Sequence, residues 1–146
     1  MVVINSAGSF KPYGHGRMIV IEHVVITLNI AKDINITITV PEGFIFDGAS
    51  IPRFGWLILG PPFEPEFIIP ACVHDWICEH AETYADRMIG DTIFFKLLTH
   101  EDVKYWKRAI MYALVRLYAI LRVKPVSYTH LDVYKRQVSS RIRSVY

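Results

Sequence analysis

The sequence has little cysteine and no long apolar run. Two cysteines among 146 residues, Cys72 and Cys78, are too few for a disulfide framework. Both lie in a segment that we expect to be helical, where a spacing of six residues turns their side chains about 240° apart, so we expect no bridge between them. Arg116 and Arg122 interrupt the most apolar segment, which stays short of the roughly 20 residues that a membrane span needs. Without a charged and apolar leader, we expect a soluble cytoplasmic protein with no membrane partner.

The chain also lacks a real surplus of charge. Its formal net charge is +2, but residues 126–146 contribute four basic side chains against one acidic one. Residues 1–125 hold 12 Lys and Arg against 13 Asp and Glu. The apparent basicity therefore gives no indication of nucleic-acid binding.

The C-terminal segment has the features of a cloning artefact. Residues 126–137 can be encoded by an inverted repeat that resembles two transposon mosaic ends joined head to head, as in sequencing-library adapters. We interpret 126–146 as such an adapter scar and a chimeric tail that is not part of the fold. A natural polar tail is the alternative, and the codons of the gene decide between the two.

The remaining composition indicates one α+β domain. Apolar residues make up 52% of the chain, enough for a single core, which we place within residues 18–125. Residues 1–17 are rich in Gly, Ser and Pro without a sustained period, and predict a flexible arm. β-branched segments then predict a small N-terminal antiparallel sheet or hairpin, with strands at Met18–Ile21, Val24–Ile30 and Ile34–Val40 and a short one at Phe44–Phe46.

Five prolines between residues 52 and 70 predict a proline-rich loop, and about three α-helices follow it. The first is expected at Pro70–His80 and the second at Asp86–Leu98, while Thr99-x-x-Asp102 resembles the capping box of a third. Apolar residues at helical spacing predict the buried faces of the last two helices: Ile89, Ile93, Phe94, Leu97 and Leu98 in one, and Val103, Trp106, Ile110, Ala113, Leu114 and Leu117 in the other.

Two short segments place polar groups next to apolar ones. Phe46–Arg53 follows the predicted sheet and holds a carboxylate, a hydroxyl and a guanidinium, from Asp47, Ser50 and Arg53. Ala71–Trp76 puts His74 beside Asp75 in an apolar helix. Polar groups in such a position need hydrogen-bond partners or take part in the function of the protein. The next helix adds Asp91.

These segments resemble domain of unknown function 1353, a family known mainly from phages and prophages. Its members share a VPxGFxxDxASxPR stretch, here VPEGFIFDGASIPR, and a later HD stretch, here HDW. The resemblance covers about Val24 to Leu121 and implies a phage or prophage protein, cytoplasmic in its host or associated with the virion, with a phage structural or host protein as a partner. The resemblance assigns no role to any residue. The positions of this chain that match the family's pattern are Asp47, Ser50, Pro52, Arg53, His74, Asp75 and Asp91.

The residues support two chemical interpretations of this site. In the first, His74, Asp47 and Asp91 bind a divalent ion such as Zn, Mn or Fe, and the protein is a metal-dependent hydrolase. The HD dipeptide alone is a weak signal, because adjacent side chains on a helix point about 100° apart. In the second, Ser50 is a nucleophile, His74 its base, Asp75 or Asp91 orients the imidazole, and Arg53 clamps an anion.

A third interpretation is purely structural, and would suit a non-catalytic phage accessory or assembly protein. Asp47 and Ser50 are common turn and capping residues, and Arg87 stands four residues before Asp91, as in an ordinary helical ion pair. Asp75 would then form an ion pair with Arg53, and this pair would tie the proline-rich loop to the helix. The sequence leaves these alternatives open and names no substrate.

The run Cys72-x-His74-x-x-x-Cys78-x-His80 has the residue types of a zinc site but not its geometry. Only His74 and Cys78 share a helix face, so four ligands from one helix do not converge on one ion. Cys78 also stands where the family usually has an aromatic residue, which indicates a packing substitution.

Overall fold

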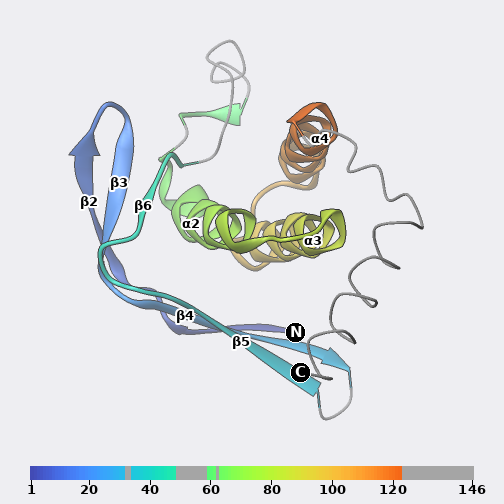
Figure 1. Ribbon diagram of the computed structural model, residues 1–146, viewed down its shortest axis with the longest axis horizontal. Coiled ribbons are helices and arrows are strands. Elements are labelled where there is room, and N and C mark those ends of the chain that lie inside the picture. The colour runs from blue at the N-terminus through green and yellow to red at the C-terminus, as the bar shows by residue number, and fades with distance from the viewer. Residues whose placement is uncertain (32–33, 49–58, 62, 123–146) are drawn as a thin grey trace, which may run out of the picture.

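The computed structural model describes residues 1–31, 34–48, 59–61 and 63–122. Along these ranges six β-strands precede the helices α2, α3 and α4, so the fold is α+β, as the sequence predicts (Figure 1). The predicted scar and tail at 126–146 lie outside the described residues. No helix within the described ranges is long and apolar enough to cross a membrane.

The predicted hairpin is confirmed and forms two of the three strands of the first sheet. Strand β4 (Val24–Ala31) pairs with β5 (Ile34–Val40) in antiparallel register. Strand β1 (Val2–Ser6) pairs with the other edge of β4. Alternation along β4 turns Val24, Ile26 and Leu28 into the core, where each is at most 3% exposed.

A second antiparallel sheet carries the exit toward the site. Its central strand β3 (Arg17–Glu22) lies between β2 (Ser9–Gly14) and the short β6 (Ile45–Phe46). In Figure 1 this sheet stands beside helix α2, while β4 and β5 extend below the helices. Asp47 directly follows β6, and its backbone N–H reaches Asp75 on α2.

The first 17 residues are not a loose arm in the structure. Strand β1 and strand β2 each pair with a neighbour over most of their length. Burial alternates along β1, and Val2 and Ile4 pack against the core. The Gly and Pro residues that obscured a strand period lie at Gly8, Gly14 and Gly16, where φ is positive, and at Pro12 within β2.

Helix α2 (Pro65–His80) begins five residues before the predicted start. Pro65 occupies the first turn, where no intrahelical N–H is required, and its ring presets a helical φ. Pro70 lies inside the helix and is buried. The predicted start at Pro70 is therefore wrong, and Pro65 is the proline at the start of the helix.

Helix α3 (Tyr84–His100) is longer than predicted and has a capping box that the sequence analysis missed. The Thr83 hydroxyl accepts from the Asp86 N–H, and the Asp86 carboxylate accepts from the Thr83 N–H. Thr99, the predicted cap of the last helix, lies instead within α3 and donates its hydroxyl hydrogen to the Phe95 carbonyl at 2.8 Å. The prediction of a capping box at Thr99 is therefore wrong.

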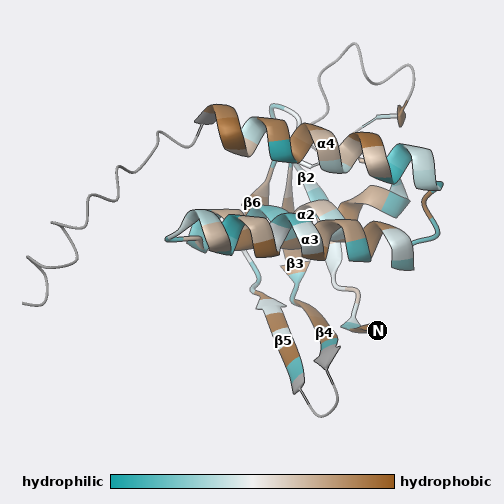
Figure 2. Ribbon diagram, turned by 90° about the vertical axis from the view of Figure 1, so that its right-hand side faces the viewer, coloured by the Kyte–Doolittle hydropathy of each residue, from teal (hydrophilic) through white to brown (hydrophobic). Residues whose placement is uncertain are grey.

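Helix α4 (Tyr105–Arg122) packs on α3, and of the predicted stripe Val103 and Leu114 lie in or against the core. Met111 and Ala119 are buried and Leu114 and Val115 lie against the same core. The predicted stripe is largely exposed, with Trp106 at 45%, Ile110 at 40% and Leu117 at 53%. Hydrophobic residues thus recur on more than one face of α4, which Figure 2 shows above α2 and α3.

Two hydrophobic clusters position the polar site between them. The first joins both sheets to α2 and α3, through Val20, Val24, Ile26, Leu28, Val40, Phe46, Cys72, Val73, Ile93 and Leu97. The second joins α2, α3 and α4, through Leu59, Phe67, Ala71, Phe94, Leu98, Val103 and Met111. Ile89, which the sequence also assigned to the core, is 55% exposed.

Candidate functional site

Helices α2 and α3 bring His74 and Asp91 into direct contact. His74 Nε2 lies 2.8 Å from Asp91 Oδ1, and the imidazole packs on the Phe94 ring with centroids 5.0 Å apart. Gly90 makes this contact possible, because a Cβ there would meet Ile77 Cγ2 at 2.9 Å. The close approach of the two helices therefore depends on a residue without a side chain.

Asp91 is the buried centre of a chain of charged groups. Its side chain is almost fully buried, with 1% of the residue exposed, and among the described residues Asp91 is the one charged residue that is buried. Arg116 of α4 donates from Nη1 to Asp91 Oδ2 at 3.0 Å, and from Nη2 to the Tyr84 hydroxyl at 2.6 Å. Both carboxylate oxygens are thus paired, which offsets the cost of burying the charge.

The charges in this chain shift the pKa values of its members in opposite directions. Burial alone would lower the pKa of His74, but the carboxylates of Asp75 and Asp91 and the Cys78 thiol outweigh it and hold that pKa well above its usual range. Burial would raise the pKa of Asp91, but the bonds from His74 and Arg116 outweigh it and lower that pKa. Both shifts favour the charged forms, an imidazolium at His74 and a carboxylate at Asp91.

Asp75 links this network to the surface. Its Oδ1 lies 3.7 Å from His74 Nδ1, and its Oδ2 accepts from the backbone N–H of Asp47 at 3.3 Å. The Asp75 side chain is 26% exposed, against 2% for Asp91. Asp75 is thus the carboxylate of the network that reaches solvent.

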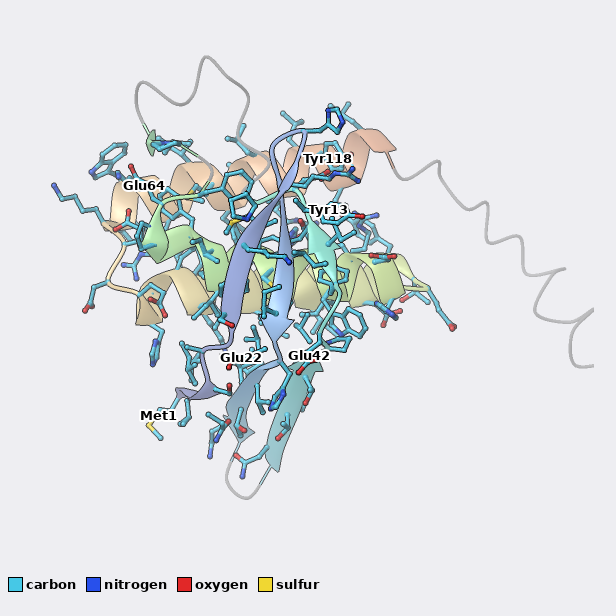
Figure 3. The ribbon with its side chains drawn as sticks, turned by 90° about the vertical axis from the view of Figure 1, so that its left-hand side faces the viewer. Met1, Tyr13, Glu22, Glu42, Glu64 and Tyr118 are labelled. Carbon is cyan, nitrogen blue, oxygen red and sulfur yellow. The ribbon has the colours of Figure 1, made fainter. Side chains whose placement is uncertain are left out.

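A cavity of about 300 Å³ opens at Asp75, between the second sheet and the helices. Figure 3 looks onto β2, β3 and β6 from this side, with Tyr118 labelled on α4. Charged residues of both signs line the cavity together with a thiol and aromatic rings: Arg17, Phe44, Ile45, Phe46, Asp47, Asp75, Cys78, Glu79, Arg87 and Tyr118. The cavity wall therefore combines charged groups of both signs with apolar surface.

The structure brings together four of the six predicted catalytic residues. His74, Asp75 and Asp91 form the network, and Asp47 reaches it through its backbone and lines the cavity. Ser50 and Arg53 lie outside the described residues, and so does the Ile51–Pro52 bond.

The predicted ion pair between Arg87 and Asp91 is not formed. Asp91 pairs with His74 and Arg116 instead, and Arg87 lines the cavity with its Nε buried and without a hydrogen-bond partner in the described part of the chain.

Three members of the site were missed from the sequence. The sequence analysis treats Arg116 only as a charge that interrupts an apolar segment, although a cation in such a position signals a buried carboxylate partner. No pattern in the sequence indicates that Tyr84 belongs to the site. Cys78 was interpreted as a packing substitution, but its Sγ lies 3.5 Å from His74 Nε2 and it lines the cavity.

Among the described residues, one group of side chains has the composition and spacing of a metal site. The donor atoms of His74, Cys78 and Asp91 all lie within 4.8 Å of one another. Asp47, a predicted metal ligand, is not a member of this group. Cys72 and Cys78 are both free thiols, as predicted.

Comparison with known families matches residues 23–115 to the family described as "Protein of unknown function (DUF1353)". The chain belongs to this family. The match spans β4 through most of α4, and includes His74, Asp75 and Asp91.

A curated relative is similar to just over half of the chain. The "Uncharacterized protein y4jT" of Sinorhizobium fredii (strain NBRC 101917 / NGR234) is 37% identical over 81 residues. The aligned part covers 54% of this chain and 23% of the relative, so the chain spans about a quarter of that protein. No solved structure gives a significant match.

Proposed function

We propose that this DUF1353 protein is a hydrolase-type enzyme in which Asp75 is the group that exchanges protons with a substrate in the cavity. One observation carries the proposal: the buried network ends at the cavity wall. Asp91, 1% exposed, holds His74, and His74 faces Asp75, whose carboxylate lines the cavity. A positioned imidazole and carboxylate beside a polar cavity have the geometry of acid–base catalysis.

The residues of the network take different parts in this proposal. Asp75 is the catalytic residue, because it faces the space that a substrate occupies. His74 and Asp91 are positioning residues, since the imidazolium fixes the Asp75 carboxylate and Asp91 fixes the imidazolium. Arg17 and Arg87 supply positive charge on the cavity wall for an anionic part of the substrate.

The test compares two changes of acid to amide on the same cavity wall. Asp75→Asn and Glu79→Gln each remove one negative charge, but Glu79 has no hydrogen bond or ion pair with His74 or Asp91 in the described part of the chain. We expect turnover in a panel of chromogenic carboxylic and phosphoric esters to fall by about 100-fold or more in Asp75→Asn, and by less than about threefold in Glu79→Gln. Absence of turnover in the wild-type panel, or equal turnover in both variants, refutes the proposal.

The competing function is a non-catalytic accessory or assembly protein of a phage, in which the network only holds the helices together. Two observations favour it: both oxygens of Asp91 have partners, and both ring nitrogens of His74 face carboxylates. His74→Ala would then lower the melting temperature by several degrees without loss of any activity. A monomer that binds no virion component counts against the assembly role.

A further inference from the structure

The side chains of His74, Cys78 and Asp91 converge on one point between α2 and α3. His74 and Cys78 lie one helical turn apart, so they share a face of α2, and Asp91 approaches from α3. The Nε2 atom of His74 lies 3.5 Å from Cys78 Sγ and 2.8 Å from Asp91 Oδ1. One nitrogen, one sulfur and one oxygen donor thus lie close together, and one of the three residues, Cys78, also lines the cavity.

We infer that these three residues bind a divalent transition-metal ion of the zinc type, with a further coordination position directed to the cavity. Imidazole, thiolate and carboxylate together suit zinc better than calcium or magnesium, which prefer oxygen ligands. The existence of the ion site does not depend on the proposed function, but its use in hydrolysis rests on that function.

The distances fit a metal that takes the place of a proton. Bonds of 2.0 to 2.3 Å to a tetrahedral ion separate neighbouring donor atoms by roughly 3.3 to 3.7 Å. The nitrogen-to-sulfur distance of 3.5 Å already lies in this range. The nitrogen-to-oxygen distance of 2.8 Å is that of a hydrogen bond, and opens by about 0.5 Å when an ion displaces the proton.

Two of the three ligands have a partner that orients them. Asp75 faces the second ring nitrogen of His74, and Arg116 binds the second oxygen of Asp91. Such outer partners are the usual support of histidine and carboxylate ligands. In this arrangement Asp75 stands between the ligand imidazole and the cavity, where it serves as the base for a water molecule bound at the open position.

Cobalt is the probe that distinguishes this ligand set from the alternatives. The full chain is treated with chelator, dialysed and titrated with Co²⁺, which gives a near-ultraviolet charge-transfer band only when a thiolate is bound. We expect one equivalent of Co²⁺ to bind with this band in the wild type. Zn²⁺ is expected to displace the cobalt and to protect Cys78 from alkylation.

Three variants locate the ligands. Cys78→Ser is expected to lose the charge-transfer band and at least 100-fold in affinity. Cys72→Ala and Asp47→Asn are expected to keep both, because Cys72 is buried away from the group and Asp47 is not a member of it. Circular dichroism verifies that each variant is folded.

The inference fails if wild-type protein binds no cobalt, if the band persists in Cys78→Ser, or if Asp47→Asn abolishes binding. The two proposals fail separately. Turnover that depends on Asp75 in a protein without metal uptake overturns the metal site alone. Stoichiometric metal without any turnover overturns the hydrolase alone.

Discussion

Arg116 of α4 donates a hydrogen bond to the buried carboxylate of Asp91 on α3, with Nη1 and Oδ2 3.0 Å apart. The same guanidinium binds the Tyr84 hydroxyl and lies 5.3 Å from the centre of the Tyr84 ring. Through Asp91 the contact continues to His74 on α2. A single guanidinium therefore joins the three helices of the described chain at the base of the candidate site.

Removal of this guanidinium is expected to destabilise the fold. Arg116→Met leaves Asp91 buried with one partner fewer, and breaking a buried ion pair from one side costs about 3 to 5 kcal/mol. Arg116 is partly exposed, so we expect a smaller loss than this range, about 2 to 3 kcal/mol, from urea unfolding. The matched control is Lys104→Met on the exposed surface, for which we expect a change within about 0.5 kcal/mol.

The cost should depend on the presence of Asp91. A double-mutant cycle of Arg116→Met with Asp91→Asn is expected to give a coupling energy above about 1 kcal/mol. Additive changes in the free energy of unfolding would contradict the pairing of these residues.

Gly90→Ala tests the close approach of α2 and α3. In an isolated helix the change from Gly to Ala is favourable by about 1 kcal/mol. Here the new methyl group meets Ile77 Cγ2 at 2.9 Å, so we expect a loss of about 1 to 3 kcal/mol instead. Ile77→Ala in the same chain should recover part of the loss, and thermal unfolding of the three variants measures it. A more stable Gly90→Ala variant would contradict the packing described.

The hydrophobic patterns predicted the elements of the fold better than their ends. The β4–β5 hairpin and the three helices follow from alternation and helical spacing, which depend on many residues at once. Start signals depend on one or two residues. Pro70 has an equivalent five residues earlier, at Pro65, and Thr99 has the spacing of a capping box although it lies inside α3. Local chemistry alone does not distinguish such alternatives, because tertiary packing decides between them.

The site was predictable for those residues that stand as polar groups in apolar segments of the sequence. His74, Asp75 and Asp91 were identified because polar groups in apolar helices require partners. The cationic partner of Asp91 was not identified. Arg87 lies at helical spacing from Asp91 and is the nearest cation in sequence, whereas the actual partner, Arg116, is 25 residues away. Arg116 reaches Asp91 only if the correct face of α4 turns toward the core. The sequence does not identify that face, because apolar residues occur on both faces of α4.

The two thiols are expected to differ sharply in reactivity. Burial, with a smaller contribution from the Asp75 carboxylate, raises the pKa of Cys72 to about 12. Cys72 is 0% exposed, whereas Cys78 lines the cavity. In chelator-treated native protein at pH 8, we expect one thiol to react with Ellman's reagent, and two after denaturation.

The variants assign the reactive thiol. Cys78→Ser should remove the fast reaction, and Cys72→Ala should leave it unchanged. Equal rates for both thiols in the native wild type would contradict the burial of Cys72.

The capping box of α3 makes the stability of the fold depend on pH, in a direction that follows from the pKa of Asp86. Hydrogen bonds from the Thr83 hydroxyl and backbone N–H lower the pKa of Asp86 below its ordinary value. A carboxyl group whose pKa is depressed by folding adds stability above its unfolded pKa of about 3.9, and this stability is lost as the pH falls through the folded pKa. Asp86→Asn lacks that contribution, so its melting temperature should lie below that of the wild type by a constant amount from pH 5 to 7. The difference should shrink below about pH 4, as the wild-type carboxylate is protonated. Glu42→Gln removes an exposed charge outside the box and should show no such convergence, while a gap that widens in acid would contradict the role of Asp86.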